Sequence, residues 1–188
     1  MAFLSLTKKA AAILQIDITQ ADTHELGLPE MEDWIVDTIW PEEKVSPGIL
    51  FYNRATGFTV ALNPAQYTVD YCLGIVKQLL ERFLSENGMA EKMPYFHKLF
   101  GIIHICKNSD RSATGYISKS KMLINYWTDS ESSQRVSNSY DLMNQINIDY
   151  RKVNGEYHNT RIQDFLSSLG NINDRSGIIL LKKTDVSL

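Results

Sequence analysis

Three segments of β type decide the fold that we predict for this chain. They span residues 34–40, 49–53 and 58–62 and read WIVDTIW, ILFYN and FTVAL. β-branched and aromatic residues dominate all three, which is typical of strands that pack against a core. The second and third segments are joined by residues 54–57 (RATG), and a short connection that contains glycine is typical of a β-hairpin. We therefore predict a three-stranded antiparallel meander.

Two further strands are expected around this meander. Residues 3–6 read as a short first strand that pairs with the hairpin region, and residues 102–106 (IIHIC) read as a buried strand that lies centrally in the sheet. Together they predict an α+β fold: a mixed, mostly antiparallel sheet with helices packed mainly on one face. Residues 1–170 form a single domain in this prediction. Residues 171–188 form a C-terminal extension, in which the apolar run 178–181 is a candidate added strand.

Helices are predicted where apolar positions recur every three or four residues. The longest helix is expected to begin with Asn63 as its N-cap and Pro64 at its first position, and to end at Gly88. Thr7 is the predicted N-cap of a short helix near the N-terminus. The other expected segments are helices at 8–14, 90–99, 140–148 and 161–169, a polar loop at 107–115 that runs into a helix through residue 127, and an irregular segment at 151–159.

The composition of the chain limits the kinds of protein to which it can belong. No stretch of the 188 residues approaches the ~20 apolar residues that a membrane helix needs. The positive charges near the N-terminus follow the short apolar run, which reverses the order of a secretion signal. We therefore expect a cytoplasmic protein without a membrane partner. The two cysteines, Cys72 and Cys106, are predicted to be free buried thiols, since no Cys-x-x-Cys motif is present.

The distribution of charge is asymmetric. Residues 1–94 carry 7 Lys/Arg against 13 Asp/Glu, a net charge of −6, and residues 95–188 carry 12 against 9, a net charge of +3. A basic C-terminal half is compatible with an anionic partner. Neither the acidic residues between 22 and 37 nor the four histidines have the spacing of metal ligands, so no metal or cofactor is predicted.

The polar segment 107–121 carries the candidate binding site. It follows a predicted strand and leads into a helix, and such a junction presents backbone N–H groups and the positive end of the helix dipole to an anion. Asn108, Arg111, Ser112 and Gly115 are its candidate ligand-binding residues, and Arg111 can make bidentate contacts with a phosphate. Lys8 and Lys9, at the start of the first helix, are expected to contribute.

A purely structural interpretation explains the same residues. Asp110 or Ser112 then caps the helix, Gly115 permits close packing, and the lysines are solvated. Likewise, His104 alternates within an apolar strand and reads as an ordinary residue of the sheet face. No recognisable base lies near Ser112 or Cys106 in the sequence, so no catalytic residue is assigned.

Several of these stretches resemble a family of small bacterial proteins that is defined only as a domain of unknown function. The resemblance rests on Leu6-Thr7-Lys8-Lys9 near the N-terminus, Asp33-Trp34 at a strand, and an Asn-x-x-Arg-Ser-x-x-Gly signature at residues 108–115. It covers about residues 1 to 170 and implies no activity. It implies that Arg111, Ser112 and Gly115 are a shared feature of the family.

Three hypotheses about function follow. The first is a non-catalytic binding module that recognises an anionic, phosphate-bearing ligand, a nucleotide or nucleic acid, through the Arg111-Ser112 loop. The second is an enzyme of hydrolase or transferase type in which Arg111 stabilises developing negative charge. The third is a protein-interaction module, such as a homodimer formed through an exposed strand edge.

Overall fold

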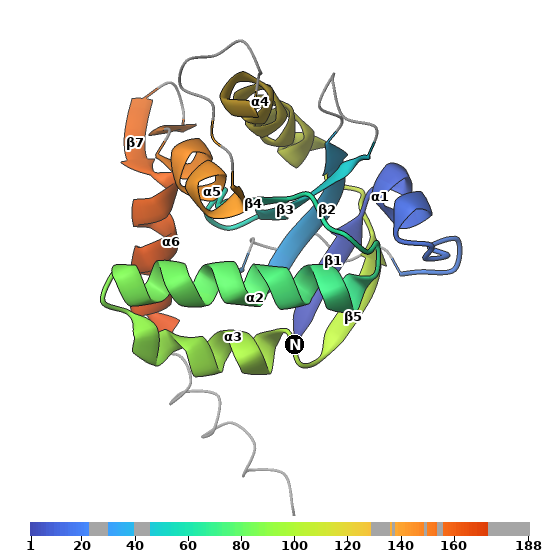
Figure 1. The fold of residues 1–188 in the computed structure, drawn as a ribbon, viewed down its shortest axis with the longest axis horizontal. Helices are drawn as coiled ribbons and strands as arrows, with labels where there is room; N and C mark the ends of the chain where they lie inside the picture. Colours follow the sequence, from blue (N-terminus) through green and yellow to red (C-terminus); the bar gives the residue numbers. More distant parts are fainter. Residues whose placement is uncertain are drawn as a thin grey trace, which may run out of the picture.

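A computed structural model gives the fold of the chain (Figure 1). It describes residues 1–22, 30–39, 46–128, 136, 138–148, 150–153 and 156–172, with the backbone alone at 111, 112, 150–153 and 156–159. In chain order the elements are β1 (Ala2–Leu6), α1 (Lys8–Ile13), β2 (Asp33–Ile39), β3 (Gly48–Asn53), β4 (Thr59–Leu62), α2 (Val69–Glu86), the 3-10 helix η1 (Ala90–Lys92), α3 (Met93–Leu99), β5 (Ile103–Lys107), α4 (Arg111–Thr128), α5 (Ser139–Asn147), β6 (Tyr150–Val153), β7 (Glu156–Thr160) and α6 (Arg161–Gly170).

The main sheet has five strands in the order β4-β3-β2-β1-β5. The predicted antiparallel meander is confirmed, because β3 pairs antiparallel with both β2 and β4. The connection between β3 and β4 spans residues 54–58 and contains Gly57, whose φ of 75° lies in the left-handed region that favours glycine. β1 lies parallel to both β2 and β5, so parallel and antiparallel pairings are equally numerous in this sheet.

Two predictions about strand order are wrong. β1 pairs with β2 and β5, not with the β3–β4 hairpin, and β5 lies at an edge of the sheet, not at its centre (Figure 1). The run of apolar residues in β5 suggested burial on both sides. Ile103 and Ile105 are only partly buried and His104 is exposed, because one edge and part of one face of β5 lie open. Composition alone does not separate such an edge strand from a central one.

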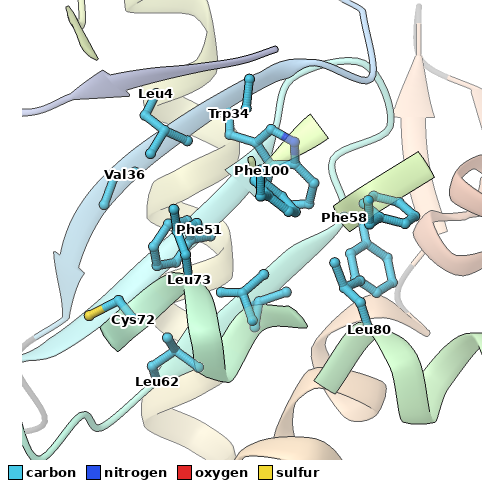
Figure 2. Packing of buried hydrophobic residues seen from close by; sticks show 14 of the residues in the cluster. Leu4, Trp34, Val36, Phe51, Phe58, Leu62, Cys72, Leu73, Leu80 and Phe100 are labelled. Carbon is cyan, nitrogen blue, oxygen red and sulfur yellow. The ribbon is translucent and has the colours of Figure 1, made fainter. Parts of the chain in front are cut away.

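The larger part of the core lies between the sheet and helices α1, α2, α3 and α6. Leu4, Trp34 and Phe51 project from the strands toward the apolar face of α2 (Figure 2). At one end of this core the ring of Phe58 stacks on that of Phe165 from α6, with 4.1 Å between the ring centroids. Burial of such large side chains supplies much of the free energy of folding, about 1.5–3 kcal/mol for each.

α4 and α5 cover the opposite face of the sheet. Ala113, Ile117 and Ile124 of α4 pack with Ile35 and other inward residues of β2, β3 and β4 in a second, smaller cluster. The expected α+β class is confirmed, with four of the six α-helices of the described residues on one face and two on the other.

Helix α2 begins later than predicted. Thr68, not Asn63, is its N-cap, and the Oγ1 of Thr68 accepts a hydrogen bond from the Tyr71 N–H. Both residue types are good caps, so the sequence offered two starts five residues apart. The predicted end is confirmed: Gly88 follows the helix with a φ of 70°, and the Met89 N–H donates to the Leu84 carbonyl.

The segment 151–159, predicted to be irregular, contains most of the β6–β7 hairpin. The pairing register of this hairpin shifts between residues 150 and 152. Such an irregularity breaks the alternation of apolar and polar residues by which a strand is predicted from sequence, and the strands were therefore missed. After this hairpin, Thr160 and Gln163 form a capping box that begins α6. The candidate strand at 178–181 lies outside the described residues.

Candidate functional site

The candidate site lies where β1 and β5 end side by side. Thr7 follows β1 and caps α1, since its Oγ1 accepts a hydrogen bond from the Ala10 N–H at 3.2 Å. Lys8 and Lys9 form the first turn of α1 and are exposed. The Asn108 N–H donates to the carbonyl of Leu6 at 3.0 Å. This hydrogen bond brings two segments that were predicted to act together, 6–9 and 108–111, next to each other.

The predicted polar loop is much shorter than residues 107–115. Helix α4 already begins at Arg111, so Arg111 and Ser112 are its first helical residues and do not belong to a loop. The connection is ordered by its own side chains: Asn108 Oδ1 accepts from the Asp110 N–H at 3.1 Å, and Asp110 Oδ1 accepts from the Ala113 N–H at 3.0 Å. Asp110 is therefore the N-cap, as in the structural interpretation. The side chains of Arg111 and Ser112 lie outside the described part of the structure.

The carboxylate of Asp110 is part of a buried charged network. Arg54, in the β3–β4 connection, donates from Nε to Asp110 Oδ2 at 2.9 Å and from Nη1 to Asp33 Oδ2 at 3.3 Å. All three residues are less than 9% exposed. The Arg54 guanidinium thus offsets the negative charge that Asp110 places at the N-terminus of α4. At this helix end the Ala113 N–H is used by the protein itself and does not serve an outside anion.

Gly115 is not required for close packing between two elements, so the structural interpretation is wrong for this residue. It lies one turn inside α4 on an exposed surface, and a Cβ built there would meet no atom within 4 Å. Among the candidate residues, then, Lys8, Lys9 and Asn108 are brought together, and Gly115 is placed further along the helix.

A second polar cluster was not predicted. Asp37, in the interior of β2, accepts hydrogen bonds from Thr7 Oγ1 at 2.7 Å and from the Thr38 N–H at 2.8 Å. Its other oxygen, Oδ2, lies 2.6 Å from the Nζ of Lys121 in α4. The signal was a charged residue in the middle of an apolar strand, which requires a partner when it is buried. Lys121 is identified as that partner only by the position of α4 over the sheet.

Neither cysteine has the properties of a nucleophile. Burial raises the pKa of the Cys72 thiol to about 11, and Figure 2 shows this side chain within the large apolar cluster. Burial, together with the carboxylates of Asp22 and Asp33, raises the pKa of Cys106. Both thiols therefore stay protonated at neutral pH.

Among the described residues, no group of three or more His, Cys, Asp or Glu side chains is placed to hold a metal ion. None of the helices that these residues form combines the length and the apolar character needed to cross a bilayer. A cavity of about 120 Å³ lies between the end of β2–β3–β4 and the helices α4 and α5, and none of the candidate residues lines it.

Comparison with known proteins gives one result. No curated protein and no solved structure was found to match the chain. A family model with the description "Domain of unknown function (DUF6933)" matches residues 3–161. This range includes every candidate residue and all of the five-stranded sheet except Ala2, and it confirms the resemblance to a family defined as a domain of unknown function. Because this match covers far more than half of the chain, the chain belongs to the family of the domain of unknown function DUF6933.

Proposed function

We propose that the protein is a non-catalytic binding module for an anionic, phosphate-bearing ligand such as a nucleotide or nucleic acid. The ligand contacts Lys8, Lys9 and Asn108 at the ends of β1 and β5, together with Arg111, Ser112 and Gly115 in the first part of α4. The observation that carries the proposal is the hydrogen bond between the Asn108 N–H and the Leu6 carbonyl, which joins the two segments.

The position in the sheet supports this assignment. Ligands of sheets with parallel strands bind outside the carboxyl ends of those strands, where the following loops begin. β1 and β5 are parallel neighbours, and the segments in question follow directly after them. The proposed contacts therefore come from the ends of two rigid strands and not from an isolated loop.

The charges of α1 also support binding of an anion. Lys8 and Lys9 are exposed, and neither forms an ion pair with any residue that the structure describes. The Nδ2 of Asn108 likewise has no hydrogen-bond partner within this part of the chain, so it is a donor that a phosphate oxygen can use. Recognition then depends on these side chains and on the Arg111 guanidinium, because Asp110 caps the helix and occupies the Ala113 N–H.

A charge-matched pair of double variants tests the site. Lys8→Ala/Lys9→Ala removes the cations of the site, and Lys77→Ala/Lys98→Ala removes two cations from α2 and α3 with the same change in net charge. Binding of tripolyphosphate, ATP and a short single-stranded oligonucleotide is measured by calorimetry at low and at moderate salt. We expect the site variant to lose at least about tenfold in affinity and the control to bind like the wild type.

Equal affinities of the two double variants would remove the proposal, since binding would then follow net charge alone. Arg111→Ala adds a second measurement, because loss of its bidentate contacts should weaken binding of phosphate groups further. Hydrolysis of the bound nucleotide by the wild type, abolished in Arg111→Ala, would instead support the enzyme hypothesis.

A further inference from the structure

β5 has an outer edge that no strand of the sheet covers (Figure 1). On its inner side the Ala2 N–H donates to the Ile102 carbonyl, and the Asn108 N–H donates to the Leu6 carbonyl. Main-chain groups alternate between the two sides of a strand, so the even-numbered residues of this segment bond to β1. The odd-numbered residues, 103, 105 and 107, therefore direct their N–H and C=O groups outward.

The open part of this edge is short and has clear limits. At one end the outward N–H of Lys107 already donates to the carbonyl of Asp22 at 3.0 Å. At the other end the N–H of Gly101 already donates to the carbonyl of Lys98 in α3 at 3.3 Å. Within the described chain, the outward groups of Ile103 and Ile105 have no hydrogen-bond partner. The centre of this open stretch is His104.

The side chains around the open edge favour contact with another protein surface. Ile102 is 65% exposed. Met1 is 51% exposed and directly precedes Ala2, the residue of β1 whose N–H donates to the Ile102 carbonyl. The exposed ring of His104 packs edge-on against Phe3, with 5.7 Å between the ring centroids. An unpaired strand edge with apolar side chains at its end, and with no proline, is a template for a further strand.

We propose that a second copy of this chain pairs with β5 in antiparallel orientation, about a two-fold axis at His104. In this register Ile103 faces the partner's Ile105, and Ile105 faces the partner's Ile103. Each pair exchanges both of its N–H···O=C hydrogen bonds, so the outward N–H and C=O groups of Ile103 and Ile105 are satisfied in both copies. The pairing joins the two five-stranded sheets into one continuous sheet.

Other pairings of the same edge form fewer hydrogen bonds between the two copies. An axis at Ile103 places Ile105 opposite the partner's Gly101, and an axis at Ile105 places Ile103 opposite the partner's Lys107. In both cases the N–H of the opposed residue is already used within its own chain. A parallel ladder staggers the bonding residues of the two strands by one position, as in the β1–β5 pair, whereas a two-fold axis along the strands sets Ile103 level with the partner's Ile103, so a symmetric parallel pairing does not form this ladder.

The interface is of the small, transient class. It consists of one short strand ladder in which Ile102 lies opposite the partner's Cys106, so it buries less area than a permanent dimer interface does. Association is therefore expected only at high protein concentration, and its detection needs an experiment that traps a weak complex.

A cysteine at the axis provides such a trap. Directly opposed residues of a pair without hydrogen bonds have Cα atoms about 4.5 Å apart, within the roughly 4.4–6.8 Å that a disulfide spans. We expect His104→Cys to form a disulfide-linked dimer under mild oxidation. The matched control is Lys107→Cys, an exposed position on the same strand that lies beyond the open stretch and far from its own copy in the partner. The control and the wild type should stay monomeric on a non-reducing gel.

Complementary charges at the same position give a second, reversible test. His104→Glu alone and His104→Lys alone place like charges opposite each other and should remain monomeric in sedimentation experiments. An equimolar mixture of the two should form a heterodimer. The proposal is overturned if His104→Cys cross-links no faster than Lys107→Cys, or if mixing the charged variants produces no association. Anion binding enters neither measurement, so these results are independent of the proposed function.

Discussion

The Nε of Arg54 lies 2.9 Å from Oδ2 of Asp110, and this contact ties the β3–β4 connection to the N-terminus of α4. A second contact of the same kind joins Lys121 to Asp37. Through both, basic and acidic side chains from the two halves of the sequence meet within one molecule. Of the two, only the Lys121–Asp37 pair joins a cation of the basic half to an anion of the acidic half, so these two contacts offset only a small part of the charge asymmetry along the chain.

Removal of the Arg54 guanidinium should be strongly destabilising. Arg54→Ala leaves the carboxylates of Asp33 and Asp110 buried and without the cation that they share. Breaking a buried charged network in this way costs about 3–5 kcal/mol of the free energy of unfolding. Urea unfolding measures the loss, with Arg82→Ala as control, because the Arg82–Glu86 pair is exposed and contributes little. Similar stabilities of the two variants would show that the buried network is not required.

Two glycine substitutions should change stability in opposite directions. Gly115→Ala lies in an exposed helix interior with open space around it, so alanine should stabilise the protein by about 1 kcal/mol. Gly88→Ala meets no atom either, but its φ of 70° is strained for any residue with a Cβ, and it should destabilise by about 1 kcal/mol. Thermal unfolding of both variants checks the signs. Destabilisation by Gly115→Ala would mean that the glycine serves a role beyond the helix.

The two thiols should be unreactive in the folded protein. Burial raises the pKa of both Cys72 and Cys106, so little thiolate is present at pH 8. With a disulfide reagent such as DTNB we expect almost no reaction in native buffer and the release of two equivalents in urea, one for each cysteine of the chain. Rapid reaction of one thiol in native buffer would contradict the burial seen here.

The contact between Tyr140 and Glu86 should be visible in the pH dependence of stability. The Tyr140 hydroxyl donates to Glu86, and this bond, followed by that from Arg82, lowers the pKa of the carboxyl below its ordinary value of 4.5. A folded-state pKa below that of the unfolded chain contributes stability above pH 4.5, and this contribution is lost as the pH falls through the folded-state value.

Tyr140→Phe should raise the pKa of Glu86 and make the loss of stability below pH 4.5 less steep. Carboxyl titration by NMR measures the pKa, and urea unfolding at pH 7 and pH 3 measures the slope. Tyr71→Phe is the control, since Tyr71 is an exposed tyrosine of the same helix, α2, as Glu86. An unchanged Glu86 titration in Tyr140→Phe would show that the hydroxyl does not act on this carboxyl.

Much of the local structure could be predicted from the sequence because its signals are local. The three β-type segments, the N-cap at Thr7 and the stop at Gly88 depend on residues within a few positions of each other. Of the site, the sequence indicated the segments that carry Lys8 and Asn108. It did not show where the polar loop ends, because Asp110 as N-cap and Ser112 as N-cap are equally good local patterns.

By itself, the sequence determined which segments become strands and helices, since side-chain shape, alternation and capping act over one or two turns of chain. Only the tertiary structure decided that β1 lies between β2 and β5, that Arg54 faces Asp110, and that the Ile103–Lys107 strand is left at an edge. Those relations join residues tens of positions apart. They depend on which packed arrangement buries the most apolar surface while every buried charge finds a partner, and no local pattern contains that comparison.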